Sequence, residues 1–593
     1  MTAGVRQEPR ERIPSRTPRR PRPAVLAALL VGFAGVGYRL ALLLADAPPT
    51  NSDEATMGLA ALHIARGDDF PVWFYGQAYM GTLEAYLAAP LFAVAGPSTF
   101  ALRLPVLALY ALFLALAWRL TRRLGGEPWF ALLVVGLLAL GSDRIVKNQL
   151  IAGGGYPELN PAGVALALLT LDLCTGRPGA RLPRWAGWGL ISGLMLWVDP
   201  LLLPYILTTG GLLVMWHRPP SRRTAPTGGP GTAGVRGTGA GRHELVGWAG
   251  VVVVGAFLLG AAPMLLDSLR HGRDPLTAVL AAGGGEATAG WGERLHGGLL
   301  LGPSLGMGFC SPGHCATWQL WWSLALPALL VLAILGACRT LLRTPAPPPP
   351  APPTVDLGKQ SSGRDGDCPR SALRAERVAA AVRLALLLGA VGVLAAYTVS
   401  SAAGRTPVES ARYLSCLAVA IPALLWPLAA ALRPRPPRPP ATAPPLGEER
   451  SLGGARVAAV AVLVAMLGSA AVATAGAVAT APATHAEADR HRALVDTLRE
   501  LRVQHVRGGY WTCNRLIFAS AEQVLCAVVD DELRPGHDRY PAYRRAVERA
   551  PDAAWVAPTG SPLAARLDQR LGTGPGDLRL VTVEGWRIYL PHP

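Results

Sequence analysis

Long apolar runs recur along this chain, and they constrain its fold more than any other feature. Several runs contain 18 or more apolar residues, and the first covers residues 24–46. The composition agrees, since 51% of the residues are hydrophobic and only 16% are charged. A helix of about 20 apolar residues crosses the hydrocarbon core of a bilayer. The sequence therefore predicts a multi-pass α-helical membrane protein with about eleven spans.

The positive charge of the chain follows this topology. The net charge is +17, and most of the arginines lie in short segments between apolar runs. Arginine-rich segments beside spans stay on the cytoplasmic side of a membrane. We therefore interpret the charge as topology control and expect no nucleic-acid partner. An odd number of spans in the cytoplasmic membrane places the N-terminus inside and the C-terminus outside.

Composition divides the chain into three parts. We expect a disordered cytoplasmic tail at residues 1–23, a transmembrane domain at 24–479 and a small external α/β domain at 480–593. Within the transmembrane domain, the pattern predicts a first external loop and three cytoplasmic linkers rich in proline, glycine or arginine, whose role the sequence does not reveal. The loop covers 47–98, and the linkers cover 217–245, 338–378 and 433–455.

Two regions need a closer reading. The apolar run at 185–216 contains Asp199-Pro200, which breaks a helix. Its arginine-rich flanks predict either two short spans joined at this point or a re-entrant hairpin. In the external domain, the periodicity predicts helices and strands in alternation. The expected helices are 491–506 and 540–550, and the expected strands are 515–520, 523–529, 553–558 and 578–590.

The first external loop is a polar, aromatic-rich island in an otherwise apolar region. It carries the adjacent carboxylates Asp53 and Glu54 and a third carboxylate, Glu84. We expect two short helices along the membrane surface, at 54–66 and 78–95. If this protein performs chemistry, the loop is where we expect it.

The acidic pair has two compatible interpretations. Residues 51–54 can begin a helix, because Asn, Ser or Asp caps the first turn and Glu54 favours the helix dipole. Alternatively, Asp53 can take a proton from an acceptor hydroxyl as a general base. Glu54 is then a candidate ligand for a divalent cation, although the sequence identifies no cofactor.

The cysteines on the predicted outside fall into two pairs. Cys310 and Cys315 share an external loop, and Cys513 and Cys526 share the external domain. An oxidising compartment favours disulfides. Metal binding and free thiols remain alternatives, but thiolate metal sites usually need about four ligands, and CSPGHC offers three.

Two stretches of the chain resemble a known family. SDEATMGLAALHIARG with FYGQAYMGTLEAY, within 52–86, is similar to the first-loop pattern of GT-C membrane glycosyltransferases. ESARYLSCLAVAIPALL, at 409–425, is similar to an Arg-Tyr-Leu segment that these enzymes carry late in the membrane region. The likeness is to the bacterial branch of glycosyltransferase family 39, related to protein O-mannosyltransferases and lipid A aminoarabinose transferases. In layout it covers residues 24–480.

The resemblance implies an inverting transfer of a sugar from a polyprenyl-phosphate donor to an acceptor outside the cytoplasmic membrane. Asp53 would be the general base, and Glu54 and Glu84 would help bind donor phosphate, metal or acceptor. Phosphate also needs positive charge. Arg412 with Tyr413 is the first candidate for it and Arg405 the second, although Arg412 is also explained as a snorkelling residue at the end of a span.

Two other classes of protein remain as alternatives. A transporter or flippase of lipid-linked sugars would place ionisable residues inside its spans and often contains internal repeats. The predicted spans are nearly free of charge, and no repeat is evident. A non-enzymatic scaffold would leave the polar loop explained only by helix capping. The identity of the sugar, the acceptor (glycan, lipid or protein), metal dependence and oligomeric state do not follow from the sequence.

Overall fold

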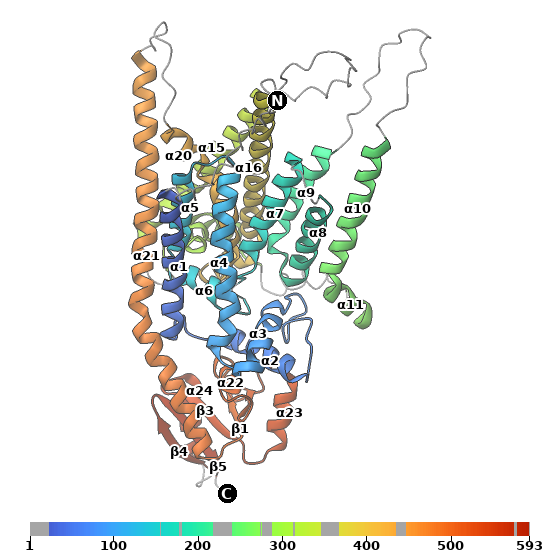
Figure 1. Ribbon diagram of the computed structural model, residues 1–593. Helices are drawn as coiled ribbons and strands as arrows, with labels where there is room; N and C mark the ends of the chain where they lie inside the picture. Colours follow the sequence, from blue (N-terminus) through green and yellow to red (C-terminus); the bar gives the residue numbers. More distant parts are fainter. Residues whose placement is uncertain are drawn as a thin grey trace, which may run out of the picture.

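A bundle of membrane-spanning helices stands on a small α/β domain in the computed structural model (Figure 1). The structure describes residues 23–154, 156–176, 181–217, 240–272, 274, 288–311, 315–344, 367–433, 446–573 and 578–591. The predicted tail at 1–23 lies almost wholly outside these residues. So do the central parts of the three predicted linkers.

The helical bundle contains the elements that the apolar runs predicted, together with shorter turns between them. The long helices are α1 Pro23–Leu44, α4 Thr99–Arg123, α9 Leu203–His217, α10 Ala240–Gly260, α15 Trp321–Arg343, α16 Asp367–Val399 and α21 Leu446–Glu500. Shorter helices are α5 Pro128–Ala139, α6 Asp143–Leu150, α7 Leu159–Thr175, α8 Arg181–Val198, α11 Ala262–His271, α13 Trp291–Leu295, α14 Gly302–Gly306, α17 Ser401–Arg405, α18 Pro407–Ser410, α19 Ile421–Leu424 and α20 Trp426–Leu432. Tighter or wider turns are η1 Pro200–Leu202, η2 His296–Leu301, η3 Thr317–Leu320 and η4 Ala411–Ala420.

By length and composition, seven helices of the described residues can cross a membrane, or up to nine if each of two bent pairs counts as one span. The bent pairs are α5 with α6, at 90°, and α10 with α11, at 63°. Helix α7 is apolar but shorter, and α8 is not among these candidates. The multi-pass helical fold is therefore confirmed, whereas the total of eleven spans stays a prediction.

Residues 185–216 form two helices, as one interpretation of the sequence predicted. Helix α8 ends at Val198, and the Asp199 side chain accepts a hydrogen bond of 2.8 Å from the N–H of Leu201, which starts the short turn η1. Helix α9 then begins at Leu203. Asp199-Pro200 breaks the run because proline cannot continue a helix from the residue that precedes it.

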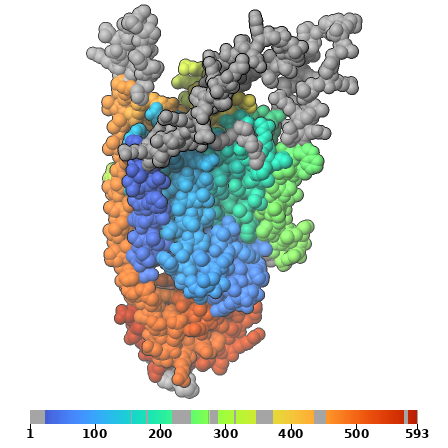
Figure 2. All heavy atoms as spheres, in the orientation of Figure 1, coloured from blue at the N-terminus to red at the C-terminus, as the bar shows by residue number. Residues whose placement is uncertain are grey.

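The first external loop forms two helices that lie between the bundle and the α/β domain (Figures 1 and 2). Helix α2 is Ser52–Arg66, capped by the Asn51 side chain and ended by Gly67 with φ 78°, a left-handed conformation that favours glycine. Helix α3 is Leu83–Ala95 and begins five residues later than expected at 78. Residues 78–82 instead form the turn that closes a bridge between Trp73 and Gly81.

The α/β domain contains a five-stranded sheet in the order β2-β1-β3-β5-β4. Strands β1, β2 and β3 are mutually parallel, and β5 pairs antiparallel with β3 and β4. The strands are β1 His505–Gly508, β2 Leu525–Val528, β3 Ala554–Pro558, β4 Leu578–Val583 and β5 Trp586–Pro591, and the helices are α22 Tyr510–Ala519, α23 Pro541–Arg549 and α24 Pro562–Thr573.

Several elements differ from the sequence predictions. The helix expected at 491–506 ends at Glu500, and the strand expected at 578–590 forms the two strands β4 and β5. Residues 515–520 were expected as a strand but lie at the end of helix α22, where buried apolar residues recur at helical spacing. Helix α21 continues through the expected domain boundary at 479/480 without a break, so one helix carries both the last predicted span and the start of the α/β domain. The ends of the predicted linkers are also helical, since α10, α15, α16 and α21 extend into them.

This arrangement predicts the sides of the membrane on which two exposed arginines lie. Arg119 lies at the end of α4 remote from the α/β domain, and Arg570 is exposed within that domain (Figure 1). In a background without free thiols, we expect cysteine at 570 to react with a membrane-impermeant thiol reagent from outside intact cells. Cysteine at 119 should react only after lysis, and labelling of both from one side would contradict the topology.

Candidate active site

The two adjacent carboxylates at the start of α2 point to different partners. Glu54 is fully buried and receives hydrogen bonds of 2.6 Å from both Nε and Nη2 of Arg103, on α4. Thr50 donates a further bond of 2.7 Å to the same carboxylate. The Arg103 Nη1 donates to the carbonyl oxygen of Pro48 at 2.9 Å. A bidentate buried pair of this kind fixes the position of α2 on the membrane helices.

The buried pair gives a stability prediction. Arg103→Met leaves the Glu54 carboxylate buried without its counter-charge, which costs about 3–5 kcal/mol of unfolding free energy. The double variant Glu54→Gln with Arg103→Met removes both charges and should recover most of that loss. Denaturant unfolding of the purified protein in detergent measures both. Equal stability of Arg103→Met and the wild type would show that the pair does not hold α2.

Asp53 faces the α/β domain instead. Its Oδ1 accepts hydrogen bonds from the Tyr510 hydroxyl at 2.6 Å and from Arg539 Nη2 at 3.0 Å. Arg539 Nε also donates to the Tyr510 hydroxyl at 2.7 Å, so the three groups form a closed triangle. Burial and the bond to Asp53 raise the pKa of Tyr510, which keeps its phenol protonated. Within the described residues, no hydrogen bond reaches the second oxygen of Asp53.

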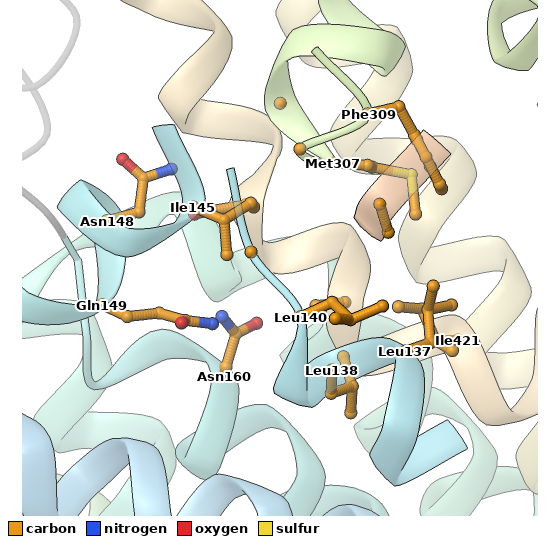
Figure 3. Close-up of a pocket in the computed structure, with 16 residues that line it drawn as sticks. Leu137, Leu138, Leu140, Ile145, Asn148, Gln149, Asn160, Met307, Phe309 and Ile421 are labelled. Atoms are coloured by element: carbon orange, nitrogen blue, oxygen red, sulfur yellow. The ribbon is translucent and has the colours of Figure 1, made fainter. Parts of the chain in front are cut away.

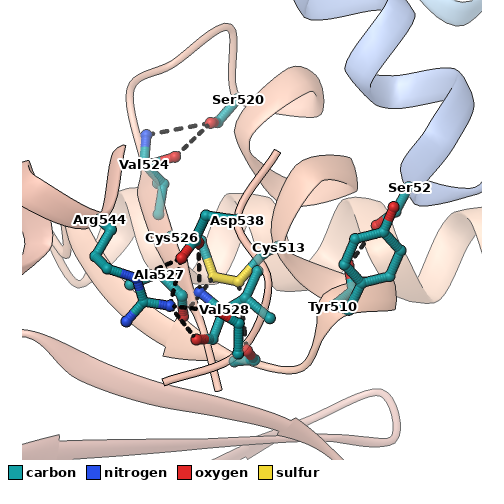
Figure 4. Close-up of a disulfide and its surroundings, with 12 residues drawn as sticks. Ser52, Tyr510, Cys513, Ser520, Val524, Cys526, Ala527, Val528, Asp538 and Arg544 are labelled. Atoms are coloured by element: carbon teal, nitrogen blue, oxygen red, sulfur yellow. Dashed lines mark hydrogen bonds and ion pairs between the residues drawn. A yellow bond between two sulfur atoms is a disulfide. The ribbon is translucent and has the colours of Figure 1, made fainter. Parts of the chain in front are cut away.

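Figure 4 shows the Cys513–Cys526 disulfide with Tyr510, Asp538 and Arg544 nearby. The disulfide joins α22, which begins at Tyr510, to strand β2. Asp538, next to Arg539, accepts a bond of 2.9 Å from the Val528 N–H and pairs with Arg544. Arg544 also donates to the Val528 carbonyl oxygen at 2.6 Å. The loop that carries Arg539 is therefore fixed to the sheet.

Further contacts dock α22 onto α2. Asn514 donates to the Thr56 hydroxyl at 3.0 Å, and Ser52 donates to the carbonyl oxygen of Tyr510. Gly58 lies against the ring of Phe518 so closely that a Cβ at this position would come within 2.6 Å of the ring. Only glycine allows this approach of the two helices.

The edge of this interface centres on Glu522. Its carboxylate contacts the His63 ring at 2.9 Å, accepts from the Tyr543 hydroxyl at 2.8 Å and pairs with Arg66. Burial alone would raise the pKa of Glu522, but the bonds from His63 and Tyr543 and the charge of Arg66 outweigh it and lower the pKa to about 2.

The lowered pKa of Glu522 predicts an acid-sensitive interface. A carboxyl whose pKa is lower in the folded state stabilises that state above its unfolded pKa of about 4.3. This contribution falls as the pH drops from there towards 2. We expect the melting temperature of the wild type to fall more steeply below pH 4.5 than that of Glu522→Gln. Glu548→Gln, at an exposed position of α23, is the control, and parallel curves for all three proteins would contradict the assignment.

A second group of carboxyls lies beneath the first loop. Glu84, on α3, and Glu158, which precedes α7, are both buried and lie near each other, and burial raises the pKa of Glu158 well above its usual range. Glu84 also accepts a bond of 3.2 Å from the Gly153 N–H, and burial raises its pKa. Burial and the charge of Glu84 raise the pKa of Asp199, at the break between α8 and α9, to about 7. One oxygen of Glu158 has no hydrogen-bond partner among the described residues.

Arg412 and Tyr413 lie near both groups. The Arg412 guanidinium lies 5.9 Å from the ring centre of Tyr156 and 5.6 Å from that of Tyr413, and it interacts electrostatically with Asp53. In the part of the chain that the structure describes, Arg412 forms no ion pair with a carboxylate, and its Nε has no partner. A largely buried guanidinium that forms no direct ion pair is a ready site for an anion.

The glycine loop after α6 connects these groups. Gly153 has φ 75° and contacts the backbone of Asp53, and Gly154 has φ 112° and lies beside Arg412. A side chain at Gly153 would come within 3.1 Å of the Asp53 carbonyl oxygen. The loop therefore lets the backbone pass between the base candidate and the cation.

Other predicted site residues lie elsewhere. Arg405 is exposed at the end of α17, and no described contact joins it to the cluster. The oxygens of Glu54 are taken by Arg103 and Thr50, so they are not free for a metal. Among the described residues, no group of three or more His, Cys, Asp or Glu is placed to hold a metal ion. A divalent cation therefore has no assigned ligands in this part of the protein.

Cys310 and Cys315 form a disulfide in the segment before η3, so the disulfide interpretation of this pair is confirmed.

Close to Phe309, a pocket of about 40 Å³ lies among α5, α6, α7 and η4 (Figure 3). The amides of Gln149 and Asn160 face it, and Asn160 Oδ1 has no protein partner among the described residues. A polar cavity of this size has room for a few water molecules.

The site includes residues that sequence reasoning did not single out. Tyr510 and Arg539 contact Asp53 across 457 and 486 residues of sequence, and no local pattern signals such pairing. Glu158 lies in a loop beside a predicted span and was a candidate for the cleft from the sequence, but neither it nor the preceding stretch GGGYP, at 153–157, could be distinguished there from an ordinary loop.

The apolar helices, the two-helix first loop and the α/β domain docked on it form an arrangement that a solved structure shares. The chain is similar to ArnT from Cupriavidus metallidurans bound to undecaprenyl phosphate, with a TM-score of 0.51 and 14% identity over 96% of this chain and 97% of that one. It is also similar to the oligosaccharyltransferase AglB from Archaeoglobus fulgidus, with a TM-score of 0.43 and 12% identity over 90% and 69% of the two chains. No family model and no curated protein sequence matches the chain. The GT-C fold expected from the sequence resemblance is thereby confirmed.

Proposed function

We propose that this protein is a membrane glycosyltransferase that moves a sugar from a polyprenyl-phosphate donor to an acceptor hydroxyl at the outer face of the cytoplasmic membrane. The observation that carries the proposal is the state of Asp53. One oxygen is fixed by Tyr510 and Arg539, and the other has no described partner. The carboxylate is thus oriented on one side and open on the other, as a general base requires.

The reaction is a displacement with inversion. The acceptor oxygen forms a bond to the anomeric carbon of the sugar, and the bond from that carbon to the phosphate oxygen breaks. Asp53 Oδ2 takes the acceptor proton, and the lipid phosphate leaves with the bonding electrons. Phosphate is a stable leaving group, so no protein acid is needed on that side.

Arg412 is the candidate for binding the donor phosphate. Its guanidinium has an Nε without a described partner, is largely buried and lies against the faces of two tyrosines. A planar guanidinium binds phosphate through two parallel hydrogen bonds. The raised pKa values of Glu84 and Glu158 suit these carboxyls to contact sugar hydroxyls, because a protonated carboxyl can donate a hydrogen bond as well as accept one.

ArnT, a protein of similar fold, was solved bound to undecaprenyl phosphate, which supports a polyprenyl-phosphate donor here. The acceptor remains a glycan, a lipid or a protein. A flippase of lipid-linked sugars and a non-enzymatic scaffold are the alternatives from other classes. Neither explains why the α/β domain should hold one oxygen of Asp53 and leave the other open.

Asp53→Asn tests the general base. Asparagine keeps an oxygen that can accept from Tyr510 and Arg539, but its amide nitrogen cannot take a proton. We expect the transfer of radiolabelled sugar from polyprenyl phosphate, by full-length protein in membranes, to fall about 10²- to 10⁴-fold. Donor binding should persist, and Arg412→Ala should lose it.

Asp68→Asn, an exposed carboxylate of the same loop, is the matched control and should remain active. Full activity of Asp53→Asn would end the assignment of the base. If the donor crosses the bilayer without being consumed, the flippase interpretation replaces the glycosyltransferase proposal. If the wild type neither binds, moves nor consumes any donor, the scaffold remains.

A further inference from the structure

A second cavity lies on the other side of the Glu54–Arg103 pair, where the membrane helices meet the α/β domain. We call it the junction cavity. Its volume is about 360 Å³, within the usual range of ligand sites of about 300–1,000 Å³. Asp53, Glu84 and Arg412 do not line it, so it is separate from the proposed reaction centre. Its lining comes from the end of α1, the start of α4, α21 and α22.

The start of α4 supplies hydrogen-bond donors to the cavity. Ser98 caps this helix, and Ser98, Thr99 and Phe100 all line the cavity. The first N–H groups of a helix have no partners within it, and its N-terminus carries partial positive charge. Helix α4 has 25 residues, so its dipole is fully developed.

Two side chains of the opposite wall have nitrogens without partners among the described residues. His491, on α21, is only 6% exposed, and its Nε2 forms no hydrogen bond with them. Arg515, on α22, uses Nη1 and Nη2 for Glu487, at 2.8 and 3.1 Å, while its Nε has no partner there. Buried polar atoms are rarely left unpaired in native proteins, so each one calls for an explanation.

The carboxylates at the cavity are already neutralised by cations of the protein. Glu487 pairs with Arg515, and Asp46 pairs with Arg492 at 3.2 Å and His485 at 2.8 Å. The charges that act on the His491 ring are those of Arg515 and Arg492. The charges at the cavity are therefore balanced in pairs, and its unpartnered polar groups are nitrogens, which suit a ligand that brings acceptor oxygens, such as an anion.

The position of the cavity narrows the choice of anion. Helix α1 ends at Leu44 and α4 begins at Thr99, and both are candidate spans. The cavity therefore lies where two spans leave the hydrocarbon core, at the depth of phospholipid headgroups. A phosphate group has several acceptor oxygens, which donors on opposite walls can reach together.

We propose that the junction cavity binds the phosphate group of an anionic lipid headgroup, through the start of α4, His491 Nε2 and Arg515 Nε. The site does not include the groups proposed to act in the transfer reaction, although Arg103 and Thr50, which hold Glu54, line it. Its occupant would touch α4, α21 and α22 together, at the point where the α/β domain meets the membrane.

The test uses full-length protein in detergent and native mass spectrometry. The probes are phosphatidylglycerol, diacylglycerol as a lipid without phosphate, and inorganic phosphate. We expect phosphatidylglycerol to bind, diacylglycerol not to bind, and His491→Phe to weaken binding by about tenfold or more through the loss of one donor to a charged group. Phenylalanine preserves the edge-to-face contact that His491 makes with Trp586.

His217→Phe is the matched control, because His217 makes the same kind of contact with Trp185, outside the cavity. If His491→Phe does not fold, Arg515→Lys serves in its place, since lysine can still pair with Glu487 but has no Nε–H. If inorganic phosphate binds as tightly as phosphatidylglycerol and displaces it, the cavity is a site for free phosphate, and the lipid assignment is overturned. Equal binding of diacylglycerol, or binding unchanged in both variants, would overturn the proposal altogether.

Discussion

The ion pair between Glu54 and Arg103 is the constraint on which the rest of the site depends. It is buried on both sides and bidentate, and it anchors the first turn of α2 to the membrane helices. Since the next residue along a helix points about 100° away, anchoring Glu54 inward turns Asp53 towards the α/β domain. The two neighbouring carboxylates thus have separate tasks, one holding the helix and the other meeting Tyr510 and Arg539.

The α/β domain is accordingly part of the site, because it supplies two of the residues that contact Asp53. Its parallel strands bring Tyr510 and the fixed loop of Arg539 to the edge that faces α2. In open sheets of this kind, the carboxyl ends of the strands are where ligands bind. Here that edge lies against the membrane domain, so the groups that meet at Asp53 come from both domains.

Much of this could be predicted from the sequence, because the signals were local. Asn51 capping α2, the break at Asp199-Pro200 and the apolar spans each follow from residues near to one another. The prediction of a strand at 515–520 was wrong because a short apolar run does not distinguish a buried helix from a strand. The contacts of Asp53 could not be predicted, since they join segments more than 450 residues apart and arise from tertiary packing alone.

Helix α21 couples the two halves of the molecule mechanically. Its 55 residues form one helix that contains Pro482, bends in its lower part and runs from the far end of the bundle into the α/β domain (Figure 1). Because the helix is continuous, the number of residues in it sets the orientation of the α/β domain relative to the bundle. Because a helix turns about 100° per residue, one residue more or fewer in the span would change the direction in which the α/β domain leaves the helix. The register of the last span is therefore as much a determinant of the site as the side chains within it.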